Sequence, residues 1–182
     1  MKGYTRLDQS DAGDWELIRE DHLAHIRSVA PLRIMDQLRG LGDLCLGFPC
    51  DQLQHSLMTA TLARAAGADD ETVVTALCHD LGKIVSVPNH AAIGAEMLKP
   101  YVSADHYQAV LHHQEFQGLY YHGFIGLPTN LRDAYRAESW YSLAEELVDQ
   151  WDMPAFDPEF AADPLESFEP EVIKVFSSPQ WM

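Results

Sequence analysis

Apolar residues recur along this chain at intervals of three and four, and this helical spacing constrains the fold more than any other feature. Proline and glycine interrupt the pattern. Asp51, Ser103 and either Asp69 or Asp70 stand at positions typical of helix N-caps, and Ser142 begins a capping-box pattern. Pro31 and Gly67 stand at positions typical of helix ends. No run of alternating apolar and polar residues is long enough to indicate a sheet. The sequence therefore predicts an all-α fold, with helices over 14–29, 32–41, 51–66, 69–81, 88–100, 103–117 and 142–152 and a loop over 118–128. The second helix is expected to place Leu32, Met35, Leu38 and Leu41 on one apolar face.

The length of the chain favours one domain, because 182 residues can bury one sizeable core and no linker or repeat divides them. We therefore expect residues 1–182 to form a single domain. The last thirty residues hold five of the ten prolines and six acids against one lysine. This tail, 153–182, is expected to wrap the surface or stay loose, with one apolar patch at Val172, Ile173, Val175 and Phe176.

Charge and cysteine content exclude several classes of partner. Twelve basic and 28 acidic residues give a net charge of −16, which disfavours nucleic acids and anionic membranes as partners. A small anionic substrate remains compatible, because one buried cation can reverse the local field. No apolar stretch approaches the ~20 residues needed to span a bilayer. Three cysteines without CxxC spacing indicate the reduced thiols of a cytoplasmic protein.

Histidine is the informative residue type, because most of its nine copies lie in the middle of the chain. His79 and Asp80 end an apolar helix just before a glycine, which favours a bend toward a polar pocket. His55, His90 and His112 lie on or beside apolar helix faces, where an unpartnered imidazole is costly to bury. A metal would satisfy these nitrogens, and a carboxylate can bridge two ions. The pattern predicts a buried metal centre.

The order of these residues resembles the HD-domain superfamily of metalloproteins over roughly residues 51–156, and the resemblance implies a helical bundle around a dinuclear metal site. It is closest to the mixed-valent diiron oxygenases that degrade organophosphonates, and more distant from myo-inositol oxygenase. Gln52 and His55 match the Gln-x-x-His motif that precedes the other ligands in the phosphonate enzymes. The separate histidine pair His90 and His112 suits a second metal, which a single-metal nucleotide phosphohydrolase would not need.

By this resemblance the two metals are Fe(II) and Fe(III), with O₂ as the co-substrate. One iron takes His55, His79, Asp80 and an aspartate near residue 150, and Asp80 bridges to the second iron. The ligand set that the resemblance implies is His55, His79, Asp80, His90, His112 and Asp152.

Two positions in this set stay open between neighbouring residues. Asp152 flanks the apolar stripe of the last predicted helix, whereas Asp149 points away from it, so helical phase favours Asp152. His112 and His113 flank the stripe of their helix on opposite sides, so helical phase does not choose between them. The family's Leu-His pair, matched here by Leu111 and His112, favours His112, which leaves His113 as a residue of the outer shell or one that faces substrate.

Lys83 and Phe48 are the expected substrate contacts, together with His113. Lys83 follows Asp80 by about one helical turn, and a lysine at this point contacts substrate in inositol oxygenase, which this segment resembles. Its alternative role is that of a cation that stabilises a helix end. The phosphonate oxygenases for primary amines resemble one another in a Tyr and a Glu ahead of the first histidine, where this chain has Cys45 and Phe48. An aromatic ring there suits a trimethylammonium group, which donates no N–H hydrogen bond.

The resemblance thus implies an O₂-dependent diiron oxygenase of phosphonate catabolism. Its expected reaction is cleavage of the C–P bond of a 1-hydroxyalkylphosphonate, with 1-hydroxy-2-(trimethylammonio)ethylphosphonate giving phosphate and glycine betaine. The partner is a small molecule, and the sequence does not predict the oligomeric state. A metal-dependent HD-domain phosphohydrolase is the alternative, because the same His and Asp ligands also serve Mn and Zn. A non-catalytic HD module would be free to lose ligands, so the full set argues against it.

Overall fold

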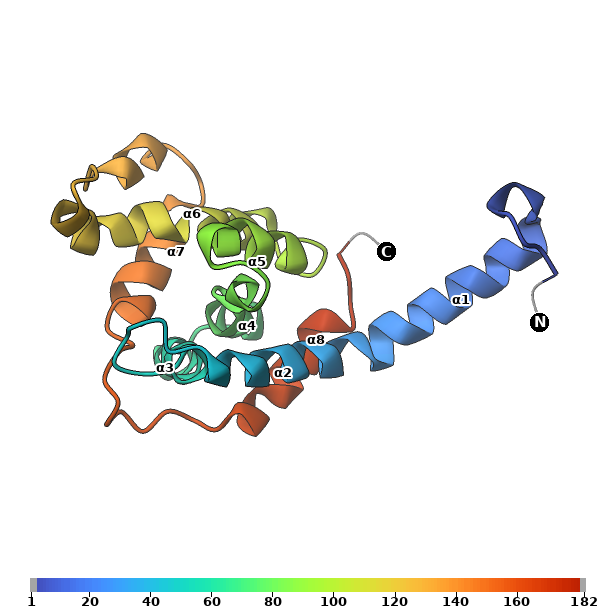
Figure 1. Ribbon diagram of the computed structural model, residues 1–182, viewed down its shortest axis with the longest axis horizontal. Coiled ribbons are helices and arrows are strands. Elements are labelled where there is room, and N and C mark those ends of the chain that lie inside the picture. The colour runs from blue at the N-terminus through green and yellow to red at the C-terminus, as the bar shows by residue number, and fades with distance from the viewer. Residues whose placement is uncertain (1–2, 181–182) are drawn as a thin grey trace.

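The computed structural model describes residues 3–180, so the last two residues of the predicted tail lie outside the described part. Every regular element within that range is helical (Figure 1), which confirms the all-α prediction. None of these helices combines the length and apolar character that crossing a membrane requires. In chain order the helices are α1 (Ala12–Ser28), α2 (Ala30–Gly40), α3 (Gln52–Ala65), α4 (Asp70–Cys78), α5 (His90–Leu98), α6 (Ala104–Tyr121), α7 (Tyr141–Glu146) and α8 (Glu169–Phe176).

Side-chain caps begin three of the central helices. Asp51, Asp69 and Ser103 each accept a hydrogen bond from the backbone N–H three residues later, at the starts of α3, α4 and α6. Gly67 ends the turn after α3 with a φ of 83°, a conformation that glycine adopts without steric cost. The predicted starts of α3 and α6 are therefore confirmed, and Asp69 rather than Asp70 is the cap of α4.

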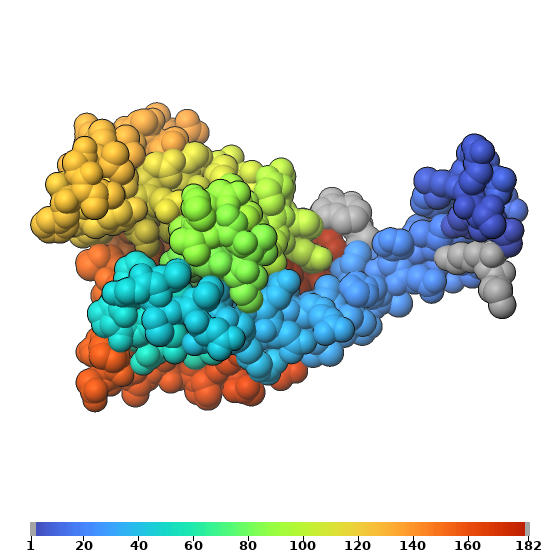
Figure 2. All heavy atoms as spheres, viewed as in Figure 1, coloured from blue at the N-terminus to red at the C-terminus, as the bar shows by residue number. Residues whose placement is uncertain are grey.

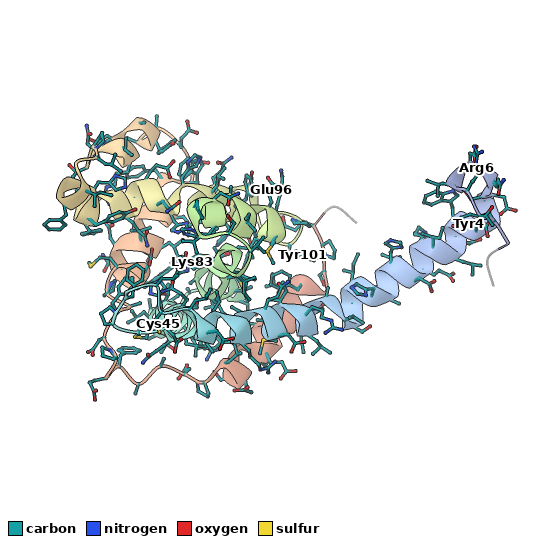
Figure 3. The ribbon with its side chains drawn as sticks, viewed as in Figure 1. Tyr4, Arg6, Cys45, Lys83, Glu96 and Tyr101 are labelled. Atoms are coloured by element: carbon teal, nitrogen blue, oxygen red, sulfur yellow. The ribbon has the colours of Figure 1, made fainter. Side chains whose placement is uncertain are left out.

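The N-terminal helices differ from the prediction. Pro31 lies in the first turn of α2 rather than ending α1, because the first helical residues need no N–H donor. The buried residues of α2 are Pro31, Ile34, Met35 and Leu38, whereas Leu32, expected among them, is 49% exposed. Helix α1 has no buried residue and projects from the body (Figures 1 and 2). Tyr4 lies at its far end, remote from the helices around Lys83 (Figure 3).

Residues 165–176 of the C-terminal tail pack into the core, which corrects the expectation that the whole tail wraps the surface or stays loose, whereas residues 153–164 are mostly exposed and form no helix. Helix α8 packs against α2 and α4 and buries Val172, Val175 and Phe176, whereas Ile173 is exposed. Just before it, Phe168 is fully buried beneath the guanidinium of Arg64, which lies 3.8 Å from the ring centroid. The acids of this segment help to hold it, because Asp163 and Glu171 both pair with Arg64.

Two further elements depart from the prediction. Helix α6 continues through Tyr121 into a 3₁₀ segment, His122–Ile125, where a loop was expected from residue 118. The capping box predicted at Ser142 does not form, because α7 begins at Tyr141 without a side-chain cap. After Glu146 the chain widens into a π-helix, Leu147–Asp152, with a hydrogen bond from the N–H of Met153 to the carbonyl of Val148.

Helices α3, α4, α5 and α6 form the central bundle. Helix α3 packs on α4, α5 packs on α6, and the π-helix closes one side by packing on α3 and α6. Apolar side chains from these elements form one continuous core. A group of buried polar side chains interrupts that core where α3, α4, α5, α6 and the π-helix meet.

Candidate metal centre

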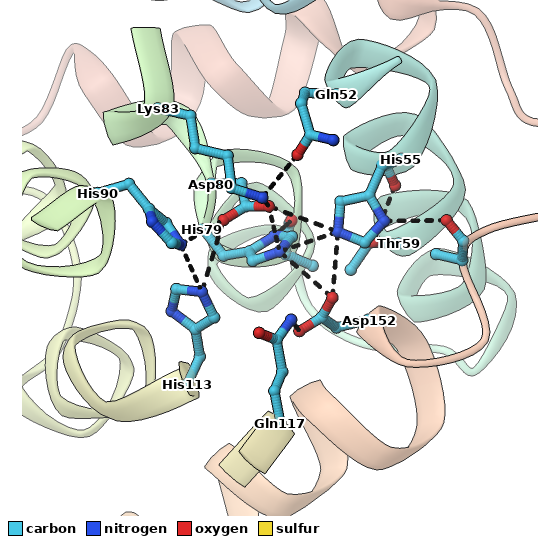
Figure 4. Close-up of polar contacts among 12 residues, drawn as sticks. Gln52, His55, Thr59, His79, Asp80, Lys83, His90, His113, Gln117 and Asp152 are labelled. Carbon is cyan, nitrogen blue, oxygen red and sulfur yellow. Dashed lines mark hydrogen bonds and ion pairs between the residues drawn. The ribbon is translucent and has the colours of Figure 1, made fainter. Parts of the chain in front are cut away.

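Four histidines and two aspartates from five separate elements converge inside the bundle (Figure 4). Five of them are fully buried and His90 is 5% exposed. Apart from the adjacent His79 and Asp80, the side chains come from different elements, so tertiary packing brings them together. His55 lies in α3, His79 and Asp80 directly follow α4, His90 begins α5, His113 lies in α6, and Asp152 ends the π-helix.

The carboxylate of Asp80 lies between the two pairs of histidines. Its Oδ1 atom is 3.0 Å from Nε2 of His90 and 3.5 Å from Nε2 of His113. Its Oδ2 atom is 3.5 Å from Nε2 of His79 and 3.6 Å from Nε2 of His55. One oxygen thus faces each pair, which is the arrangement that a bridging carboxylate requires.

Asp152 faces one of these pairs only. Its Oδ1 atom is 3.1 Å from Nε2 of His55 and 3.5 Å from Nε2 of His79. Its Oδ2 atom accepts a hydrogen bond from Nε2 of Gln117 at 2.6 Å. The His55–His79 pair therefore faces two carboxylates, and the His90–His113 pair faces Asp80 alone.

Backbone carbonyls fix the protonation of the four imidazoles. In every ring Nδ1 lies 2.7–2.9 Å from a carbonyl oxygen, which can only accept, so Nδ1 carries the proton and Nε2 of the neutral ring holds a lone pair. The two Nε2 atoms within each pair are only 3.3 and 3.2 Å apart. Facing lone pairs repel unless a cation lies between them, and such outer hydrogen bonds are typical of metal-binding histidines. The carbonyls belong to Ala155, Ala76, Val87 and Val110.

Two buried oxygens support a fit to metal ions. Oδ1 of Asp80 and Oδ1 of Asp152 are shielded from solvent and have no hydrogen-bond partner, which is costly for a carboxylate unless a cation is bound. Two groups of residues each have ligand atoms close enough together to hold one ion. The first is His55, His79 and Asp152, and the second is His79, Asp80 and His113. The chemistry of this donor set, imidazole nitrogens with carboxylate oxygens, suits a divalent transition metal.

The electrostatics of the cluster agree with this fit. Burial opposes ionisation of Asp80, but His79, His113 and His90 hold the pKa of this carboxyl well below its usual range. Burial also lowers the pKa of His79, but the carboxylates of Asp80 and Asp152 outweigh it and raise the pKa to about 9, so without a metal this ring carries a second proton on Nε2, which a bound ion would displace. The cluster therefore holds two buried anions and stabilises positive charge beside them.

The close approach of two backbones shapes the turn that carries Asp80. Helix α4 ends at Cys78, and a 3₁₀ segment, Leu81–Ile84, packs directly on α5. A Cβ at Gly82 would lie 2.1 Å from the carbonyl oxygen of His90, so only glycine fits there. This contact places His90 opposite Asp80.

The structure corrects the choice between the adjacent histidines of α6, because His113 rather than His112 lies beside His90. The His112 ring stacks on Trp140, with 5.1 Å between ring centroids, and its Nδ1 is 3.3 Å from Glu115. The two rings leave the helix about 100° apart, and packing against α5 turns His113 inward. His113 is therefore a member of the cluster rather than an outer-shell or substrate-facing residue.

Asp149 and Asp152 lie in different surroundings, as helical phase predicts. Asp152 lies in the cluster, whereas Asp149 forms an ion pair with Arg132 at 2.8 Å near the surface. The helix that carries them is nevertheless a π-helix rather than the expected α-helix, and such segments are common at functional sites.

A cavity of about 650 Å³ adjoins the cluster, and both Lys83 and Phe48 line it. The Lys83 ammonium contacts Oδ2 of Asp80, donates to Oε1 of Gln52 at 2.6 Å, and lies 5.6 Å from the centroid of the Phe48 ring. His90 is the member of the cluster that reaches the cavity. The rest of the lining is mainly apolar and aromatic, with Leu46, Val87, Pro88, Gln114, Gln117, Tyr120, Tyr121, Met153 and Phe156.

Sequence reasoning missed two residues of this site. Phe156 stacks on His55 with 4.4 Å between ring centroids and on Phe48 with 5.2 Å. Gln117 holds Asp152, and its only signal in the sequence is its spacing of four residues from His113 on one helix face. That signal becomes visible only once His113 is identified.

An all-helical bundle with buried histidines and carboxylates that fit metal ions defines a metal-dependent helical protein. The family model of the HD domain matches residues 53–153, which is more than half of the chain and spans α3 to the residue after the π-helix. The chain belongs to the HD domain family. No curated protein matches it.

Proposed function

We propose that this HD-domain protein is a diiron oxygenase that cleaves the C–P bond of a 1-hydroxyalkylphosphonate. The observation that carries the proposal is the placement of Asp80, with one carboxylate oxygen toward each of two histidine pairs. Such a carboxylate can hold two ions at once, which the proposed chemistry needs. The resemblance of the ligand order to the phosphonate oxygenases supports the choice of reaction.

The two metal positions would differ in how many ligands the protein supplies. The position beside Asp152 has two histidines and two carboxylates, and the other position has two histidines and Asp80 alone. The second position is also the one that adjoins the cavity, through His90. It therefore has room for substrate. The first iron would be held by His55, His79, Asp80 and Asp152, and the second by Asp80, His90 and His113.

Lys83 is suited to bind the phosphonate. Its side chain is 11% exposed and lies between the cavity and Asp80, so its ammonium can reach an anion in the cavity without leaving the site. Gln52 holds that ammonium from the other side. A lysine ammonium beside two metal ions is favourable only where anions lie between the ammonium and the metals. The carboxylate of Asp80 and the phosphonate of the substrate would be those anions.

The aromatic part of the cavity suits a trimethylammonium group. Phe48, Phe156, Tyr120 and Tyr121 all line it, and ring faces attract cations that cannot donate hydrogen bonds. We therefore propose 1-hydroxy-2-(trimethylammonio)ethylphosphonate as the substrate. The acid expected for a primary amine has no counterpart among the lining residues.

The overall reaction would convert this substrate and O₂ into phosphate and glycine betaine. When bound, the two irons would supply the activation of dioxygen for attack at C1. The protein's own part would be to hold the phosphonate through Lys83, to place the ammonium against the rings, and to exclude water with the apolar wall. The outer hydrogen bonds of the imidazoles would keep every Nε2 directed at a metal.

Metal analysis of the purified protein, followed by electron paramagnetic resonance of the half-reduced form, tests the diiron assignment. We expect two irons per chain, a mixed-valent signal, and O₂ consumption with release of phosphate from the proposed substrate. The alternative phosphohydrolase would instead contain Mn or Mg and hydrolyse phosphate esters without O₂. That result would overturn the oxygenase proposal.

A methylation series tests the substrate. Because a cation–π contact contributes about 0.5–2 kcal/mol, kcat/KM for the trimethylammonium compound should exceed that for the primary amine by roughly twofold to thirtyfold. Phe48→Glu should reduce this preference, and Lys83→Ala should weaken all phosphonates alike. Equal turnover of both compounds by the unmodified protein would refute the role of the rings and leave the diiron assignment intact.

A further inference from the structure

Gln117 lies between the cavity and the metal cluster. It is on α6, one helical turn after His113, and its side chain lines the cavity. Its Nε2 atom donates to Oδ2 of Asp152 at 2.6 Å (Figure 4). The amide nitrogen, which donates, is the atom of Gln117 that faces this carboxylate oxygen, which accepts.

Because of this hydrogen bond, the two carboxylate oxygens of Asp152 have different partners. Oδ2 is occupied by Gln117, whereas Oδ1 has no hydrogen-bond partner and points at His55 and His79. The backbone alone does not fix which oxygen faces the histidines, because the terminal torsion of an aspartate side chain is broad and roughly two-fold. An interaction with one oxygen is therefore needed to set the plane of the carboxylate.

We propose that Gln117 is a positioning residue that holds the Asp152 carboxylate for metal binding. The inference rests on the metal-binding part of the proposed function and not on the choice of reaction or substrate. Without the amide, Asp152 can rotate, and its second oxygen loses its partner inside a buried site. Outer-shell partners of metal ligands commonly change metal affinity by roughly 10–100-fold.

Gln117→Met tests this role, because methionine has a similar length but no N–H to donate. Gln114→Met is the matched control, since Gln114 lies one turn earlier on α6 and lines the same cavity. Apoprotein is titrated with Co²⁺, and the visible absorption of the bound ion reports each binding step. We expect roughly 10–100-fold weaker binding at one of two steps for Gln117→Met, and binding like that of the unmodified protein for Gln114→Met.

A double-mutant cycle separates positioning from a general effect on folding. In an Asp152→Ala background, Gln117→Met should leave the remaining Co²⁺ binding unchanged, because its partner is gone. A loss of affinity of the same size in that background would overturn the proposal, as would Co²⁺ affinity in Gln117→Met equal to that of the unmodified protein. Absence of Co²⁺ binding in the unmodified protein would overturn both this inference and the metal-dependent function.

Discussion

Asp80→Ala is the substitution that most directly tests the hypothesis that the cluster binds two metal ions. Asp80 is the residue whose two oxygens face different histidine pairs, so its removal takes a ligand from both proposed positions at once. His90→Ala takes a ligand from one position and leaves all four ligands of the other, His55, His79, Asp80 and Asp152, in place. The two variants should therefore differ in metal content, with none retained in the first and about one ion per chain in the second.

The size of the effect follows from linkage between binding and folding. A metal at 100 times its Kd stabilises the folded state by about 2.7 kcal/mol for each site. For a chain of 182 residues, each kcal/mol shifts Tm by about 2–4 °C. The metal-induced rise in Tm should then be about 11–22 °C with both sites filled and about 5–11 °C with one.

Differential scanning calorimetry of each variant with and without metal measures this rise, and metal analysis after gel filtration measures the ions retained. Each variant is compared with its own apoprotein, so that changes in intrinsic stability cancel. We expect a full rise for the unmodified protein, about half for His90→Ala, and none for Asp80→Ala. Two ions per chain in Asp80→Ala, or a full rise in Tm, would refute the bridging role.

Three further substitutions test other parts of the structure. Metal analysis should show that His113→Ala loses one ion per chain and His112→Ala none, although lost stacking costs His112→Ala about 0.5–1.5 kcal/mol of stability. Oxygen consumption should vanish in Asp152→Ala and persist in Asp149→Ala, and the opposite result would move the ligand to Asp149. Phe176→Ala should lower the free energy of unfolding in urea by about 3–5 kcal/mol, whereas a loose tail would give almost no change.

Much of the helical architecture follows from local sequence. A capping side chain reaches only the backbone N–H groups of its own first turn, so Asp51, Asp69 and Ser103 specify helix starts without help from the rest of the chain. The adjacency of His79 and Asp80 is likewise local, and it points to the cluster in any fold that buries the end of α4. The adjacent His79 and Asp80 therefore identified part of the candidate metal centre from the sequence alone.

Other features depend on contacts between distant segments. The prolines and acids after residue 152 are typical of loose chain, yet Val172 and Phe176 lie against α2 and α4, and buried apolar area outweighs local composition there. Similarly, Phe156 reaches His55 because the segment after the π-helix returns to α3, where the carbonyls of Ala155 and Pro158 contact His55 and Gln54.

The choice between neighbouring residues shows most clearly what the sequence determined and what the tertiary structure decided. Helical periodicity separated Asp152 from Asp149, because one of them flanks a clear apolar stripe. It could not separate His112 from His113, because they lie on opposite sides of their stripe and both sides meet other elements. Packing of α6 against α5 turned His113 toward Asp80 and left His112 to Trp140. The sequence by itself determined which residue types form the centre, and tertiary packing decided which copies do, because a helix fixes directions only relative to its own axis.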